Sequence, residues 1–188
     1  MNKVNRHYSA DMRTEEELQE QLRGLREIVA VLYVCGIDYY LSAGTMLGAV
    51  RDGDFIPWDW NVSVACPAEQ FDHQYDRLVK IFTDKGYKVQ QRIKKGFYAI
   101  NIYKAGVKYV IESLKLVGNY RELPMHKIPV RFFTGRAVAK IRGHEFYITE
   151  NAEEFFEWYY GADWRTPKQA TGRDDCITGN SKKKRGEP

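Results

Sequence analysis

The stretch GTMLGAVRDGDFIPWDWNVSV, from Gly44 to Val64, constrains the fold more than any other part of the chain. It follows an apolar run, DYYLSAG, that is typical of a buried strand ending in a glycine turn. TMLGAVRDG predicts a short helix, and DWNVSVAC predicts a second strand. Asp59, Asn61 and Ser63 alternate along that second strand, so their side chains share one face. The stretch therefore predicts a sheet with a polar face that lines a cleft.

An amphipathic helix is predicted before this stretch, over residues 15–35. Thr14 and Glu17 form a capping-box pattern at its start. Leucine and valine side chains then recur at alternating spacings of four and three residues, and Gly36 ends the helix. Such spacing places the apolar side chains on one face of the helix.

A second helix and a run of strands are predicted next. Pro67 begins the helix, and Gly86 is its predicted C-cap. YKVQQRI, FYAINIY and KYVIESLKLV are strand-like, and RFFTGRAVAKIRGHEFYI predicts further short strands. Asn151 caps a late helix, AEEFFEWYY, which Gly161 ends. This order of elements predicts an α+β domain with a mixed sheet and flanking helices.

The length and hydropathy of the chain predict its organisation. A chain of 188 residues is long enough for one domain with a sizeable core. We expect an N-terminal extension over residues 1–13, a folded domain over 14–169 and a disordered basic tail over 170–188, where the apolar pattern ends. No apolar run approaches the roughly 18 residues that a membrane helix needs. The N-terminus lacks the apolar segment of a signal peptide, so a cytoplasmic location is expected.

Cysteine spacing and charge argue against several function classes. The three cysteines, Cys35, Cys66 and Cys176, match no zinc spacing and no disulfide framework, so reduced thiols are expected. The net charge of +4 is small, and the KKKR run at residues 182–185 supplies much of it. No nucleic-acid motif accompanies these basic residues, so a nucleic-acid partner is not expected.

The residues around the glycine turn suggest phosphate binding. Gly44 lets backbone amides approach a phosphate, and the Thr45 hydroxyl can donate to it. Arg51, on the short helix, can hold a phosphate with two parallel hydrogen bonds. The alternatives are an ordinary strand-to-helix turn with a threonine cap, and a solvated surface arginine.

The polar strand and one later acid suggest a metal site. If carboxylates occupied the face formed by Asp59, Asn61 and Ser63, Mg²⁺ could bridge them to substrate phosphates. Glu112 is a single acid in the apolar strand KYVIESLKLV, and such a group is costly to bury unless it faces a site. The alternative for both strands is a polar face turned to water.

YYLSAGTMLGAVRDGDFIPWDWNVSV resembles the signature of the LicD/fukutin-related family. The resemblance lies in Gly-Thr, Leu-Gly-Ala, Arg51 and Ile-Pro-Trp-Asp. GHEFYITENAEEFFEWYYGADWRTP resembles the closing segment of the same family, so the similarity extends over about residues 20–167. It implies a nucleotidyltransferase-like fold and an Mg²⁺-dependent enzyme. Such an enzyme transfers a phospho-alcohol, such as phosphocholine or ribitol phosphate, from a CDP-linked donor to a glycan hydroxyl.

The resemblance also implies roles for individual residues. Asp59, Asn61 and Glu112 would surround Mg²⁺ and carry the catalytic chemistry. The donor would be bound by a second set of residues, Gly44, Thr45, Arg51 and Trp58. Trp58 would stack on the cytosine or on a sugar ring, with core packing as the alternative.

The sequence departs from the family where the chemistry should lie. The family has aspartates at alternate positions after Pro-Trp, whereas this chain has Asn61 and Ser63. An amide oxygen can bind Mg²⁺ but neutralises none of its charge. Three interpretations stay open: a variant that binds donor but turns over slowly, an enzyme with an altered acidic set, or a relative that only binds nucleotide or glycan. We favour an enzyme whose metal site is weakened at Asn61.

The expected partners also follow from the family. They are a CDP-linked alcohol donor and a glycan or lipid-linked saccharide acceptor inside the cell. The basic tail would permit peripheral contact with anionic lipid, although a solvated tail is the simpler view. Two rival functions stay open. One is a binding module that uses KKKR and the tyrosines, and the other is a nucleotidyltransferase that attaches a nucleotide instead of a phospho-alcohol.

Overall fold

The computed structural model describes residues 12–124 and 126–169. Its helical segments are α1 (Glu15–Val34), α2 (Ala43–Arg51), α3 (Ala68–Phe71), η2 (Asp72–Gln74), α4 (Tyr75–Asp84), η3 (Val130–Phe133) and α5 (Ala152–Tyr160). Its strands are β1 (Tyr40–Leu41), β2 (Asn61–Pro67), β3 (Lys88–Lys94), β4 (Phe97–Lys104), β5 (Val107–Val117), β6 (Tyr120–Leu123), β7 (His126–Pro129), β8 (Arg136–Ile141) and β9 (His144–Thr149). Most of the predicted N-terminal extension and all of the predicted basic tail lie outside the described residues.

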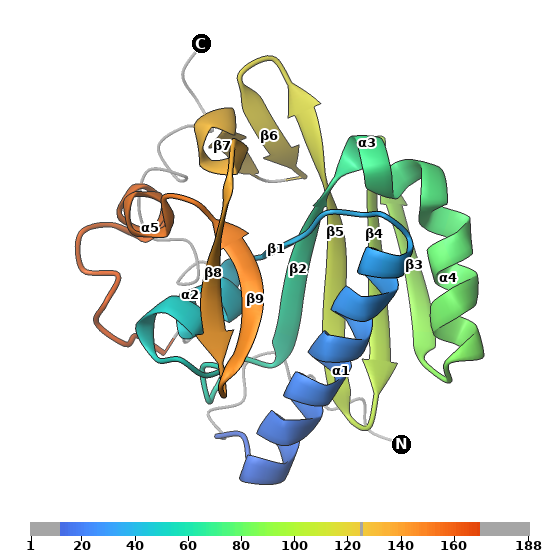
Figure 1. Ribbon diagram of the computed structural model, residues 1–188, viewed down its shortest axis with the longest axis horizontal. Helices are drawn as coiled ribbons and strands as arrows, with labels where there is room; N and C mark the ends of the chain where they lie inside the picture. The colour runs from blue at the N-terminus through green and yellow to red at the C-terminus, as the bar shows by residue number, and fades with distance from the viewer. Residues whose placement is uncertain (1–11, 125, 170–188) are drawn as a thin grey trace.

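Most of these strands join one mixed sheet (Figure 1). The strand order is β1, β2, β5, β4, β3; β2 and β5 run parallel, and the other neighbours in this order are antiparallel. β6 continues from β5 and pairs with β7, while β8 and β9 form a separate hairpin. The mixed sheet with its flanking helices confirms the predicted α+β class.

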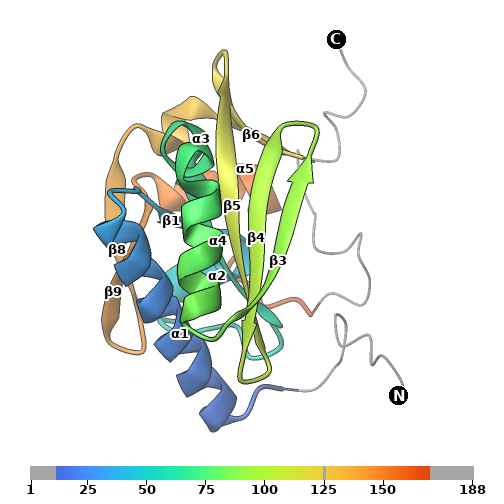
Figure 2. The same ribbon diagram turned by 90° about the vertical axis from the view of Figure 1, so that its right-hand side faces the viewer.

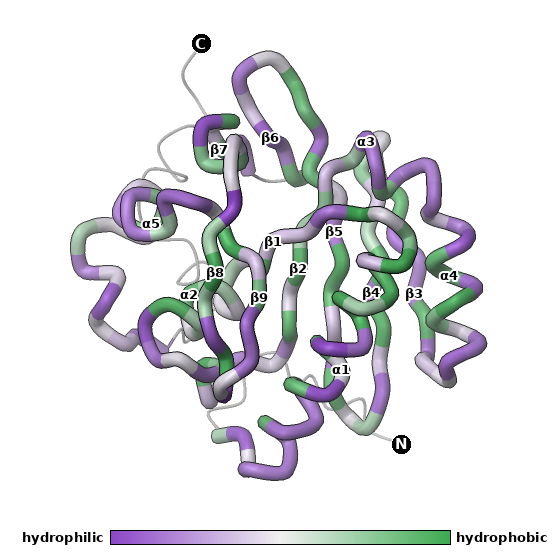
Figure 3. Tube along the Cα trace, viewed as in Figure 1, coloured by the Kyte–Doolittle hydropathy of each residue, from purple (hydrophilic) through white to green (hydrophobic). Residues whose placement is uncertain are grey.

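Helices α1 and α4 cover one face of the sheet (Figure 2). Leu25 and Leu32 of α1 and Leu78 of α4 are fully buried there, in one core with Ile100 of β4 and Ile111 of β5. In Figure 3 hydrophobic colour follows the central strands, while the edge strand β3 is mainly hydrophilic. Helices α2 and α5 and the β8–β9 hairpin lie toward the β1 end of the sheet (Figure 1). The face of β2 and β5 that α1 and α4 do not cover is therefore available for a functional site.

Helix α1 begins and ends as the sequence predicts. Thr14 Oγ1 accepts a hydrogen bond from the Glu17 amide at 3.2 Å, and the Glu17 carboxylate accepts one from the Thr14 amide at 2.9 Å. Gly36 has a φ of 67°, the left-handed conformation that glycine adopts without strain. None of the helices described here, α1 included, is long and apolar enough to cross a membrane.

The segment after α1 differs from the prediction. Only Tyr40–Leu41 pair as a strand, and α2 already begins at Ala43. Gly44 and Thr45 therefore lie in the first turn of a helix, and the chain turns at Ala43, whose φ is 48°. The apolar pattern hides this boundary because β1 and much of α2 are both buried. The single helix predicted from Pro67 is instead divided into α3, η2 and α4.

Candidate functional site

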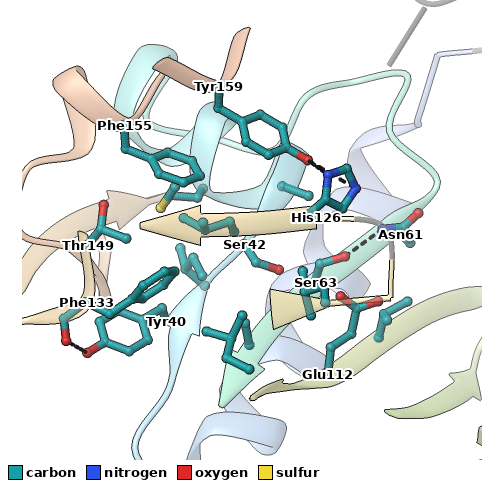
Figure 4. Close-up of a pocket in the computed structure, with 18 of the residues that line it drawn as sticks. Tyr40, Ser42, Asn61, Ser63, Glu112, His126, Phe133, Thr149, Phe155 and Tyr159 are labelled. Carbon is teal, nitrogen blue, oxygen red and sulfur yellow. Dashed lines mark hydrogen bonds between the residues drawn. The ribbon is translucent and has the colours of Figure 1, made fainter. Parts of the chain in front are cut away.

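A pocket of about 360 Å³ lies over one face of β2 and β5 (Figure 4). Several polar and charged side chains from the sheet line it: Asn61, Ser63, Arg92, Lys108 and Glu112. Its other wall is aromatic and comes from β1, η3 and α5: Tyr40, Phe133, Phe155, Tyr159 and Tyr160. Ser42 and Ala43 bring the N-terminal end of α2 to the same pocket. The pocket thus combines a charged sheet face, a helix N-terminus and an aromatic wall.

Strand register brings the polar residues together. In the parallel pair β2–β5, Asn61 lies opposite Lys108, and Glu112 lies on the same face of β5 as Lys108. Residues paired across two strands point to the same side of a sheet, so these side chains share the pocket face. Glu112 pairs with Ala99 of β4, and Ala99 pairs with Arg92 of β3. The small Ala99 puts no bulky side chain between Arg92 and Glu112.

Asn61 and Ser63 are bonded to each other on the sheet side of the pocket. The Asn61 side-chain nitrogen donates to Ser63 Oγ at 2.8 Å (Figure 4). The backbone N–H of Ser63 donates to Thr45 Oγ1 at 2.9 Å. Because Thr45 is only 2% exposed and does not line the pocket, its hydroxyl joins α2 to β2. These contacts make a rigid and electrically neutral part of the site.

Glu112 is the acidic residue among the described pocket-lining side chains. Burial raises its pKa, and the positive charges of Arg92 and Lys108 act in the opposite direction. Burial also lowers the pKa of Lys108, assisted by Arg92 and opposed by Glu112 and Asp59. The charged groups of the sheet face therefore influence one another across the pocket.

Asp59 is not one of the pocket-lining residues. Its Oδ1 accepts a hydrogen bond from the Asn61 amide at 3.2 Å. Its Oδ2 lies against Gly44, where an added Cβ would be 2.1 Å away. Burial raises the pKa of Asp59 to about 6, while the hydrogen bond from the Asn61 amide and the charge of Arg13 act in the opposite direction. Gly44 thus allows the close approach of a carboxylate to the first turn of α2, where the helix dipole favours negative charge.

The remaining predicted donor-binding residues also lie outside the pocket lining. Arg51, at the C-terminal end of α2, donates to both carboxylate oxygens of Asp52, at 2.8 and 2.6 Å. Trp58 packs against the main hydrophobic core. Of the predicted catalytic residues, the structure brings Asn61 and Glu112 into one pocket. Direct contact of a donor with Arg51 or Trp58 stays a prediction.

The part of the chain that carries this sheet face matches a known family. Residues 36–112 match the family model described as LicD/FKTN/FKRP, nucleotidyltransferase domain. Over these residues the chain is similar to the LicD/fukutin-related family. The LicD match begins after α1 and ends at Glu112, so it includes α2, β2 and the residues of β5 that line the pocket as far as Glu112.

Two relatives of the LicD segment match over a shorter length. Over 47 residues the chain is 49% identical to the ribitol 5-phosphate transferase FKRP of Mus musculus, and equally so to that of Homo sapiens. The matched segment is 23% of this chain and 10% of each relative. The chain therefore matches about a tenth of the length of these relatives.

Two solved structures of ANT(2'')-Ia have a similar chain path. The solution structure of this antibiotic-resistance factor has a TM-score of 0.49 and 13% identity, covering 70% of this chain and 66% of the other. The crystal structure with adenylyl-2''-tobramycin has a TM-score of 0.47 and 12% identity, covering 70% of each chain. Both scores are below 0.5, so the fold assignment rests on the sheet topology and the LicD match.

The described pocket residues do not fit the Mg²⁺ ion that the LicD resemblance implies. Within residues 12–124 and 126–169, no three His, Cys, Asp or Glu side chains are placed to hold a metal ion. Glu112 shares the pocket with the cations Lys108 and Arg92, and Asn61 contributes no charge. Mg²⁺ depends on oxygen ligands, several of them carboxylates or phosphates, and neighbouring cations repel it. On the sheet face of the pocket, the chemistry available is that of two cations, one carboxylate and a neutral amide–hydroxyl pair.

Sequence reasoning missed several residues of this pocket. Lys108 lies four residues before Glu112 and on the same face of β5, which was the available signal, but Arg92 joins them only through the register of β3, β4 and β5. On the far wall, the Tyr159 hydroxyl lies 3.3 Å from Nδ1 of His126 (Figure 4). His126 and Tyr159 come from β7 and α5, which no local pattern brings together.

Proposed function

We propose that the chain is a LicD-type transferase that moves a phospho-alcohol from a CDP-linked donor to a hydroxyl of a glycan or lipid-linked saccharide. The family match supports this, as does the 47-residue similarity to ribitol 5-phosphate transferases. The observation that carries the proposal is that Glu112 shares a pocket with Arg92 and Lys108. A proton acceptor there lies beside two groups that attract phosphate.

The donor diphosphate would lie along the sheet face of the pocket. Arg92 and Lys108 supply positive charge there. Ser42 and Ala43 bring the N-terminal end of α2 to the same place, and a helix N-terminus favours anions. The nucleoside or the acceptor sugar would contact the aromatic wall, whose rings offer stacking surfaces.

The reaction makes one bond to phosphorus and breaks another. The acceptor hydroxyl oxygen attacks the phosphorus of the phospho-alcohol, the bond from that phosphorus to the bridging oxygen breaks, and CMP leaves. The hydroxyl proton passes to the Glu112 carboxylate, whose raised pKa makes it a stronger base. Arg92 and Lys108 stabilise the negative charge that develops on the leaving phosphate.

A second candidate is a relative that binds the donor or a glycan without catalysis. The neutral pair of Asn61 and Ser63 favours it, because the LicD resemblance predicts aspartates at these alternate positions. A third candidate, a nucleotidyltransferase that attaches CMP itself, would use the same pocket and differ in the group transferred.

A transfer assay separates the three candidates. The chain is incubated with CDP-ribitol, CDP-glycerol or CDP-choline and a panel of oligosaccharide acceptors, with and without Mg²⁺. The masses of the acceptors are then measured by mass spectrometry. A phospho-alcohol transferase adds the mass of the phospho-alcohol and releases CMP. Donor binding without any product identifies the binding-only relative, and the added mass of CMP identifies the nucleotidyltransferase.

Glu112→Gln tests the assigned base in the same assay. We expect a rate loss of about 100-fold or more, because general base catalysis contributes on this scale. The donor dissociation constant should not rise, since the carboxylate is not assigned to phosphate binding. Glu145→Gln, at an exposed position on β9, is the matched control. An unchanged transfer rate in Glu112→Gln removes Glu112 from the proton-transfer role.

A further inference from the structure

Among the described residues, no counter-ion lies within 4.0 Å of Lys108 or Arg92, the two cations of the pocket. Lys108 and Arg92 both line the pocket, and neither side chain has an ion pair within 4.0 Å or a hydrogen bond to any described residue. Lys104, on β4 of the same sheet, by contrast forms an ion pair with Glu27 at 3.2 Å. Lys108 is half-buried, whereas Arg92 is exposed. An unpaired positive charge therefore costs more free energy at Lys108 than at Arg92.

The formal charge of the sheet face favours an anionic ligand. Lys108 and Arg92 contribute two positive charges and Glu112 one negative charge, while Asn61 and Ser63 are bonded to each other and neutral. A metal-binding version of this face would need carboxylates on β2 to attract a divalent cation. With these residues the face instead attracts phosphate oxygens directly.

A purely structural role for Lys108 fits the contacts less well. A lysine kept to neutralise Asp59 or Glu112 would lie in an ion pair with one of them, and neither carboxylate is within 4.0 Å of it. Asp59 is already held by the Asn61 amide and lies against Gly44. Lys108 is therefore placed for a group that enters the pocket.

We propose that Lys108 and Arg92 bind the diphosphate of the nucleotide-linked ligand directly and without a divalent cation, the Lys108 ammonium supplying the charge that a metal ion supplies elsewhere. The identity of the ligand rests on the proposed function, whereas metal-independent binding of a diphosphate does not. Arg92, with its planar set of donors, holds the outer phosphate oxygens, and Lys108 acts as a point charge on the inner side of the pocket.

Calorimetric titration with two probes tests this directly. CDP and inorganic pyrophosphate are titrated into the full chain, once with excess EDTA and once with Mg²⁺. We expect the dissociation constant for each probe to differ by less than about threefold between EDTA and Mg²⁺, because the protein itself supplies the positive charge. Binding that disappears in EDTA overturns the inference, and if transfer activity is present the proposed function still stands.

Charge-removing variants identify the groups. Lys108→Gln should weaken both probes about tenfold or more, Arg92→Gln should act in the same direction, and Lys108→Arg should restore much of the affinity. Lys88→Gln is the matched control, since Lys88 is an exposed lysine on β3 that does not line the pocket. Equal losses in Lys108→Gln and Lys88→Gln overturn the inference.

A triple variant provides the converse test. Asn61→Asp, Ser63→Asp and Lys108→Ala together replace the cation by carboxylates, and CDP binding should then become dependent on Mg²⁺. If this variant binds CDP equally well in EDTA, Lys108 is not the required cation and the inference is wrong. Binding of pyrophosphate without CDP in the unmodified chain supports the inference and removes CDP-linked compounds from the proposed function, and binding of neither probe overturns it.

Discussion

The two faces of the central sheet place different demands on the same strands. On β5, Tyr109 and Ile111 are fully buried, in the core beneath α1 and α4. Lys108 and Glu112, each next to one of them in the chain, face the pocket instead. Residues of the first face are constrained by volume, because a close-packed core has no room to spare. Residues of the second face are constrained by charge, so stability and function separate residue by residue along one strand.

The largest expected effect comes from the core face. Ile111→Ala should lower the free energy of unfolding by about 2–5 kcal/mol, because it removes buried methyl groups and leaves a cavity. Glu112→Gln, one residue further on the pocket face, should change it by less than about 1 kcal/mol. Urea unfolding of both variants measures the difference. Similar losses in the two would show that the faces are not energetically distinct.

A smaller effect is expected where the helix beside the pocket meets β2. Gly44→Ala should lower the free energy of unfolding by about 1–2 kcal/mol, because the new Cβ would lie 2.1 Å from Asp59 Oδ2 and the carboxylate must move. The same substitution in an Asp59→Ala background should cost almost nothing, since the clashing atoms are gone. Urea unfolding of the single and double variants gives the coupling energy. An equal cost in both backgrounds would contradict the assigned contact.

The smallest expected effect is a change in how the free energy of unfolding depends on pH. The pKa of Asp59 is raised from its ordinary value of 3.8 to about 6 in the folded protein, so the native state binds its proton more tightly than the unfolded state. The stabilising contribution of that proton is present below pH 4 and is lost as the pH rises through about 6. Asp59→Asn should therefore gain stability relative to the unmodified chain between pH 4 and pH 6.5. If the free energy of unfolding of the two chains changes with pH in parallel across this window, the pKa of Asp59 is not raised.

The core face was largely predictable from the sequence. Helix α1 carries both a capping box and a regular apolar spacing. Each of these signals depends only on residues that are a few positions apart in the sequence. The alternation in β2 and the single acid in β5 likewise placed Asn61 and Glu112 on polar faces. These signals are local, and local patterns can be recognised in a single sequence.

The pocket face was predictable only in part because it depends on contacts between distant segments. Arg92 reaches the site through two strand registers, and His126 reaches Tyr159 through the docking of α5. Gly44 was expected to make room for a phosphate, whereas the structure shows it making room for the carboxylate of Asp59. A glycine indicates that something approaches closely, but the sequence does not say which group it is.

The parallel pairing of β2 with β5 ties the pocket to the folding of the whole domain. Residues 68–106 lie between the two strands, so the pairing of Asn61 with Lys108 joins segments that are far apart in the sequence. Closing so long a segment is entropically unfavourable, and the unfolded chain has no partial version of the site. A ligand held at Lys108 therefore binds the native protein alone and raises its melting temperature as the ligand concentration rises. The free energy of unfolding would then rise with the supply of that ligand.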